Sequence, residues 1–210
     1  MELLGKLLGG VPRVKIMRLF LLNPTQGFEV SDVADRSRLQ PAAARHVIAQ
    51  LAAMNFLKRR AFTKDVIDGR TERVKKKRVT GWFLNEEFPY LPELKTLLVE
   101  GEFFKNDELV KRLRPAGKVQ LLIVSGIFIQ NSDSRLDLMI VGDNLRRSYI
   151  QKAIVVLESE LGRELAYAVF DTNDFKYRIS MYDKLIRDVL DYPHERLIVG
   201  KDFSTLLLPA

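Results

Sequence analysis

The chain has 210 residues, of which 47% are hydrophobic, and these values are typical of a soluble globular protein with one large or two small domains. It contains no cysteine, which excludes disulfides and thiolate metal sites, and its two histidines are too few for a histidine-rich metal site. No apolar run of about 18 residues is present and the apolar N-terminus lacks a basic leader, so we expect a cytoplasmic protein without a membrane span or signal peptide.

The net charge of +7 is concentrated in one segment of the chain. Residues 58–78 carry ten Lys and Arg and three Asp and Glu, which is a local balance of +7. Residues 115–210 carry twelve basic and thirteen acidic side chains, so that half is nearly neutral. Charge segregated in this way indicates a polyanionic partner, although a solvated basic surface is the simpler alternative.

The first part of the chain predicts three helices. Apolar residues at helical spacing over residues 14–21 predict the first helix, which Pro24 should end. We expect Ser31 to cap a short second helix and Pro41 to open a third. The inward stripe predicted for the third helix is Ala44, Val47, Ile48 and Leu51. Its outward face is predicted to carry Gln40, Ala42, Ala43, Arg45, His46 and Gln50.

Two basic strands are predicted after the third helix. The segments "FLKRRAF" and "ERVKKKRVTGWFL" read as strands, and Asp68-Gly69 is a strong turn signal between them. This order of elements is typical of a winged helix-turn-helix, and "MRLFLLNP", "FEVSDVADRSRLQPAAARHVIAQL" and "MNFLKRR" resemble winged-helix transcriptional regulators of the ArsR/MarR type. The resemblance covers about the first 85 residues. It implies that the third helix enters the DNA major groove and that the hairpin follows the phosphates or the minor groove.

Residue chemistry suggests a role for each candidate on the third helix. Arg45, Gln40 and Gln50 are candidates for base edges, because Arg suits guanine and Gln suits adenine. His46 is a candidate phosphate contact, with a merely solvated histidine as the alternative. The small Ala42 and Ala43 would let the helix approach DNA closely.

The hairpin supplies the candidate phosphate contacts. They are Lys58, Arg59, Arg60, Lys64, Arg70, Arg73, Lys75, Lys76, Lys77 and Arg78. Neighbouring residues on a strand point to opposite faces, so we expect about half of these cations to face DNA. The alternative is a winged helix that contacts only proteins.

The second half of the chain predicts a linker helix followed by a mixed-sheet domain. Pro92 should begin a helix within residues 89–105, and its leucines would pack within the chain or across a dimer axis. Strands are predicted within residues 118–126, 135–142 and 165–175, with a closing strand at 195–200. An amphipathic helix is predicted over residues 146–164 and another helix within 174–193.

Residues from about 107 to 200 resemble the minimal nucleotidyltransferase domain of the DNA polymerase beta-like superfamily. In that family a strand ends in Gly-Ser, an Asp-x-Asp pair opens the next strand, and the carboxylates hold two Mg²⁺ ions. Gly126 matches the glycine, but Ile127 stands at the serine position. Asp137 matches the second aspartate, whereas Arg135 stands at the first.

The missing acids predict a relic site rather than a catalytic one. The third strand offers Ala166, Tyr167 and Ala168 where the family requires a carboxylate. We therefore expect a relic nucleotide site of Gly126, Arg135 and Asp137, without catalytic residues, bound metal or cofactor, in which Asp137 is held by Arg135 or by backbone N–H groups. The alternative is that a shifted loop joins Asp133 to Asp137 around one metal ion.

The predicted fold class is α+β with two domains, an N-terminal winged helix-turn-helix and a small mixed-sheet nucleotidyltransferase-like domain. The expected boundaries are 1–88 for the winged helix, 89–105 for the linker helix and 106–210 for the second, catalytically inactive domain. The expected function is sequence-specific binding of double-stranded DNA by a homodimeric transcriptional regulator, whose second domain dimerises or binds a ligand or partner. The alternatives are an active Mg²⁺-dependent nucleotidyltransferase targeted by its winged helix, and an antitoxin-like protein partner.

Overall fold

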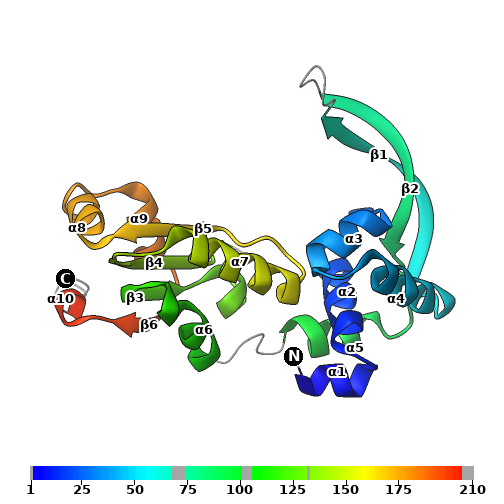
Figure 1. The fold of residues 1–210 in the computed structure, drawn as a ribbon, viewed down its shortest axis with the longest axis horizontal. Coiled ribbons are helices and arrows are strands. Elements are labelled where there is room, and N and C mark those ends of the chain that lie inside the picture. The colour runs from blue at the N-terminus through cyan, green and yellow to red at the C-terminus, as the bar shows by residue number, and fades with distance from the viewer. Residues whose placement is uncertain (1, 68–73, 101–105, 132, 205–210) are drawn as a thin grey trace. The chain divides into compact units, whose positions relative to one another are not determined.

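The computed structural model describes residues 2–67, 74–100, 106–131 and 133–204 (Figure 1). The chain divides into two compact units. The first unit comprises residues 1–101 with 158–163, and the second comprises residues 102–157 with 164–210. Each unit combines helices with a small sheet, so the fold is of the mixed α+β class that the sequence predicts.

The first unit consists of helices and a long hairpin. Its elements are α1 (Glu2–Leu8), α2 (Val11–Leu22), α3 (Val30–Ser37), α4 (Pro41–Ala53), β1 (Leu57–Ile67), β2 (Val74–Leu84), α5 (Leu91–Lys95) and the π-helical η1 (Thr96–Glu100). The predicted first and third helices are confirmed as α2 and α4, whereas α1 was not predicted. The inward stripe of α4 is buried as expected.

The start of α3 differs from the prediction. Glu29, and not Ser31, is the N-cap residue, because the Asp32 carboxylate accepts a hydrogen bond from the Glu29 N–H at 3.0 Å and completes a reciprocal capping box. At the other end Arg38 adopts a left-handed conformation (φ 52°), and the Leu39 N–H donates to the Ala34 carbonyl at 2.8 Å. This cap turns the chain sharply from α3 into α4.

The apolar core of the first unit joins α2, α3 and α4 to the linker segment. Leu98 of η1 is fully buried in this core, so the linker helix packs within the chain. Arg18 of α2 is also buried, and its Nε donates to the Leu98 carbonyl at 2.8 Å. Burial lowers the pKa of Arg18 to about 10, because the charged guanidinium loses hydration.

The hairpin β1–β2 is antiparallel over eleven residues in each strand, and its far end extends beyond α3 and α4 (Figure 1). Its register pairs Leu57 with Leu84 at the base and Ile67 with Val74 at the far end. An isolated bridge joins Phe28 to Trp82 and extends the sheet at the base. The predicted turn at Asp68-Gly69 lies outside the described residues.

The second unit contains a four-stranded mixed sheet. Its elements are α6 (Asn106–Leu113), η2 (Arg114–Ala116), β3 (Lys118–Val124), η3 (Gly126–Ile129), β4 (Leu138–Asp143), α7 (Arg147–Leu161, of which residues 158–161 belong to the first unit), β5 (Tyr167–Asp171), α8 (Thr172–Ser180), α9 (Lys184–Asp191), β6 (Glu195–Val199) and α10 (Lys201–Ser204). The strand order is β5-β4-β3-β6. Only the β4–β5 pair of this sheet is parallel, and α7 makes the crossover between them.

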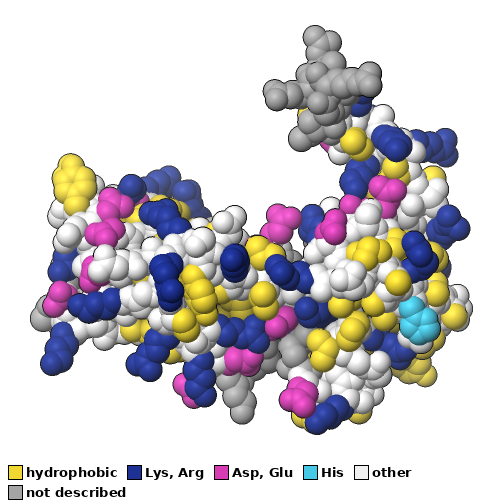
Figure 2. All heavy atoms as spheres, viewed as in Figure 1, with side chains coloured by type: hydrophobic (Ala, Val, Ile, Leu, Met, Phe, Trp, Pro, Cys, Tyr) yellow, Lys and Arg dark blue, Asp and Glu magenta, His cyan; other side chains and the backbone are white. Residues whose placement is uncertain are grey.

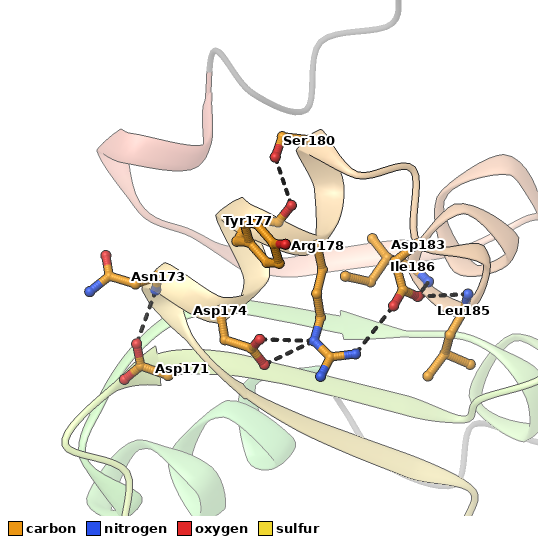
Figure 3. A network of polar contacts seen from close by, with 9 residues as sticks. All are labelled: Asp171, Asn173, Asp174, Tyr177, Arg178, Ser180, Asp183, Leu185 and Ile186. Carbon is orange, nitrogen blue, oxygen red and sulfur yellow. Dashed lines mark hydrogen bonds and ion pairs between the residues drawn. The ribbon is translucent and has the colours of Figure 1, made fainter.

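An ion network explains why one predicted helix within residues 174–193 is in fact two (Figure 3). Arg178 of α8 pairs with Asp174 at 2.9 Å and with Asp183 at 3.2 Å. Asp183 is the N-cap of α9 and accepts the N–H groups of Leu185 and Ile186. The hydrogen bond from Ile186 is the main cause that lowers the pKa of Asp183. These cationic and anionic side chains therefore stabilise the corner between α8 and α9.

Candidate nucleic-acid interface and the Asp137 cluster

The outward face of α4 carries the predicted base-reading candidates. Gln40, Ala42, Ala43, Arg45 and His46 are exposed, and Gln50 is half-buried. Gln50 differs from the others because both ends of its amide have partners within the first unit. Its Oε1 accepts a hydrogen bond from Arg13 Nη2 of α2, and its Nε2 lies 2.9 Å from His46 Nε2. No sequence signal points to Arg13 as a partner, because it lies 37 positions from Gln50.

The register of the hairpin sorts its cations into two rows. Directly opposed residues of an antiparallel pair share a face, whereas neighbours along one strand alternate. One face therefore carries Arg59, Lys76 and Arg78, and the other carries Lys58, Arg60, Lys64, Lys75 and Lys77. Figure 2 shows Lys and Arg side chains along the described part of the hairpin. Arg70 and Arg73 lie outside the described residues.

Lys58 and Lys64 pair with acidic side chains of the first unit. Lys64 Nζ lies 2.5 Å from Asp32 Oδ1 and 3.6 Å from Glu29 Oε2, the two residues of the α3 capping box. The hydrogen bond to Asp32 is the main cause that raises the pKa of Lys64. Lys58 Nζ lies 2.5 Å from Glu87 Oε2. Lys64 therefore links β1 to the start of α3 through these ion pairs, and its charge is neutralised within the first unit.

We expect Lys64→Ala to lower the free energy of unfolding by less than about 1 kcal/mol, because the pair is partly exposed and screened by solvent. Pairing raises the pKa of Lys64 above its ordinary value of 10.5, so this stabilisation is present below that pH and is lost as the pH rises through the raised value. Urea unfolding at neutral and at alkaline pH measures both effects. A difference between variant and wild type that stayed constant across this range would contradict the assignment.

Asp137 is held by backbone N–H groups. It directly precedes β4 and is 4% exposed. Its Oδ1 accepts from the Ile127 N–H at 2.9 Å, and its Oδ2 accepts from the Ala166 N–H at 2.9 Å. Because Ile127 of η3 follows β3 and Ala166 precedes β5, the carboxylate connects segments at the ends of three neighbouring strands, β3, β4 and β5.

Gly126 allows this arrangement, whereas Arg135 takes no part in it. Gly126 has a φ of +57°, and a Cβ at this position would lie 2.1 Å from Asp137 Oδ1. Arg135 Nε lies 2.7 Å from Asp188 Oδ2 of α9. The prediction that Arg135 holds Asp137 is therefore wrong, and its alternative, that backbone N–H groups hold Asp137, is correct. Of the three predicted relic residues, the structure brings together only Gly126 and Asp137.

The donor set around Asp137 does not fit a two-magnesium site. Mg²⁺ binds carboxylate oxygens that it can reach, whereas Asp137 is 4% exposed and each of its oxygens already accepts a backbone N–H group. Asp133 is exposed, and Asp171 serves as the N-cap of α8 by accepting the Asn173 N–H at 3.0 Å. Within the described ranges, no group of three or more His, Cys, Asp or Glu side chains is arranged to hold a metal ion.

Comparison of this chain with models of protein families, with curated proteins and with solved structures gave no match. None of the helices in the described part of the chain has the length and apolar character needed to cross a bilayer. The most distinctive chemistry of the described residues lies in the cationic hairpin and on the outward face of α4.

Proposed function

We propose that the first unit is a winged helix-turn-helix that binds double-stranded DNA with sequence preference. The observation that carries the proposal is the pair of cation rows on a long hairpin that projects from the same unit as α4. A row of exposed cations along a projecting ribbon suits a phosphate backbone, where each neutralised phosphate releases counterions. The outward face of α4, on which Arg45 and His46 lie among exposed small residues, suits a major groove.

The roles within this interface differ from residue to residue. Arg45 is the best candidate for a direct base contact, because it is exposed on α4 and can bind guanine O6 and N7 together. Phosphate contacts are assigned to Arg59, Arg60, Lys75, Lys76, Lys77 and Arg78, and the same role is proposed for Arg70 and Arg73. Lys64 is assigned to the fold of the first unit because of its pairing with Asp32.

For the whole protein we propose a cytoplasmic transcriptional regulator that binds paired half-sites as a homodimer. The second unit is then a nucleotidyltransferase-like domain without catalysis, which dimerises or binds a ligand or partner. The engagement of both Asp137 oxygens by backbone N–H groups supports this reading over a Mg²⁺-dependent enzyme.

Selection from a random duplex library tests the proposal. We expect the wild-type protein to enrich a short sequence motif and to prefer it over a scrambled duplex by about 1,000-fold or more, the lower range for specific DNA-binding proteins. Arg45→Ala should cost about 1–3 kcal/mol on the selected duplex and relax the preference at one position. Failure to retain any duplex would contradict the proposal, and Mg²⁺-dependent nucleotide binding by calorimetry would favour the enzyme instead.

A further inference from the structure

Three polar side chains, Arg13, Gln50 and His46, form a series of polar contacts that runs from α2 to the outward face of α4. Arg13 of α2 donates from Nη2 to Gln50 Oε1, and Gln50 Nε2 lies 2.9 Å from His46 Nε2. Gln50 and His46 are four residues apart on α4, so they lie one above the other on the same helix face. We call this series of contacts the Arg13–Gln50–His46 relay.

The chemistry of the relay fixes the position of the histidine proton. A guanidinium can only donate, so the atom of Gln50 that meets Arg13 must be its carbonyl oxygen. The amide NH₂ group of Gln50, which can also only donate, then faces His46 Nε2. His46 Nε2 must therefore accept, which places the proton of the neutral imidazole on Nδ1.

The Nδ1–H group of His46 is available to donate a hydrogen bond to a ligand outside the protein. The side chain is exposed, and within residues 2–67 and 74–100 of the first unit His46 Nδ1 has no hydrogen-bond partner. A neutral Nδ1–H is a directional donor without a net charge. In a major groove such a donor matches the acceptors on base edges, which are guanine N7 and O6, adenine N7 and thymine O4.

We propose that His46 is a specificity-determining residue of α4, which donates from Nδ1 to a base-edge acceptor in duplex DNA. Gln50, which the sequence suggested as a base reader, is instead a positioning residue. Because its oxygen accepts from Arg13, its NH₂ group donates to His46 Nε2 and leaves the histidine proton on Nδ1. This inference rests on the proposed function, because it needs α4 to lie in a major groove. It adds to that function a named donor and a fixed tautomer.

The tautomer is measurable without DNA. Long-range proton–nitrogen NMR spectra of the full chain resolve the two histidines, and the His46→Asn variant assigns the signals. In mildly alkaline buffer we expect His46 to carry its proton on Nδ1 in the wild type. In Gln50→Glu both side-chain oxygens accept, so the proton should move to Nε2. A wild-type proton on Nε2, or a tautomer that ignores Gln50→Glu, would overturn the relay.

Two matched variants test the contact with DNA. The amide nitrogen of asparagine takes the place of Nδ1, whereas that of glutamine takes the place of Nε2. On the duplex selected by the wild type, compared with a scrambled duplex, His46→Asn should keep the preference and His46→Gln should lose roughly 2- to 10-fold of it, the range for one hydrogen bond. The salt dependence should not change, because a neutral donor displaces no counterion. Thermal unfolding of each variant confirms that it is folded.

The remaining outcomes separate the two levels of the inference. Equal losses on both duplexes would assign His46 to a phosphate and overturn the base-edge contact. Wild-type preference in His46→Gln would overturn any role in reading. If the wild-type protein bound neither duplex, the proposed function would fail and the base contact with it, whereas the NMR tautomer would still decide whether the relay exists.

Discussion

Asp137→Asn is expected to lower the free energy of unfolding by about 3 kcal/mol, because it leaves a buried donor facing a donor. Each oxygen of the native carboxylate accepts a backbone N–H at 2.9 Å, and one of them would become an NH₂ group pointing at Ile127 or Ala166. With 4% of the residue exposed, water cannot satisfy the orphaned N–H. Urea unfolding measures the loss.

Asp191→Asn is the matched control for this substitution. It makes the same chemical change in the same unit, at an exposed carboxylate that pairs with Arg187 across one helical turn at 3.6 Å. We expect the control to stay within about 0.5 kcal/mol of the wild type in its free energy of unfolding.

Gly126→Ala tests the same hydrogen bonds by a different change, because the added Cβ would displace Asp137 Oδ1. Wild-type stability of both Asp137→Asn and Gly126→Ala would refute the structural role of Asp137.

Replacing Lys75, Lys76 and Lys77 together with alanine is expected to weaken binding to the selected duplex by on the order of 10- to 100-fold at moderate salt. The register places Lys76 on one face of the hairpin and Lys75 and Lys77 on the other. Whichever face lies against DNA, the variant therefore removes at least one phosphate contact. Fluorescence anisotropy at fixed salt gives the affinity, and the scrambled duplex should lose as much as the selected one, because phosphates carry little sequence information.

A second triple variant controls for the change in net charge. Lys111, Lys152 and Lys184 are exposed lysines of the second unit, and replacing them with alanine removes the same formal charge. We expect this control to bind DNA within about twofold of the wild type, because these lysines lie outside the unit that we propose binds DNA. Equal weakening by both triple variants would assign the effect to net charge and not to the hairpin.

The sequence predicted the elements that depend on local patterns. Helix α4 follows from Pro41 and the apolar spacing of its inward residues, and the strands of the second unit follow from short apolar runs. The capping box of α3 was missed because Ser31 is the commoner N-cap type, whereas Glu29 and Asp32 satisfy each other. Local patterns thus predicted whether a segment is a helix or a strand better than they predicted the residue at which it begins.

The candidate sites were harder to predict because their partners lie far along the chain. Lys64 looks like any other hairpin cation in the sequence, yet the fold places it against Asp32, 32 residues away. Arg135 and Asp137 are close in sequence, but their side chains are held by Asp188 and by backbone N–H groups. Asp137 could be recognised from the sequence as unusual. Its partners could not, because they are brought together only when β3, β4 and β5 pair in the sheet.

The slope of log affinity against log salt is the most direct measurement of DNA binding through the cationic hairpin. For the wild type on the selected duplex we predict a steep fall, with a slope of about −0.9 for each phosphate contacted. The hairpin triple variant should show a slope shallower by about 1 to 2, one contact for each lysine that faces DNA. Binding that ignores salt, or a triple variant with the wild-type slope, would contradict the proposal that this hairpin binds phosphates.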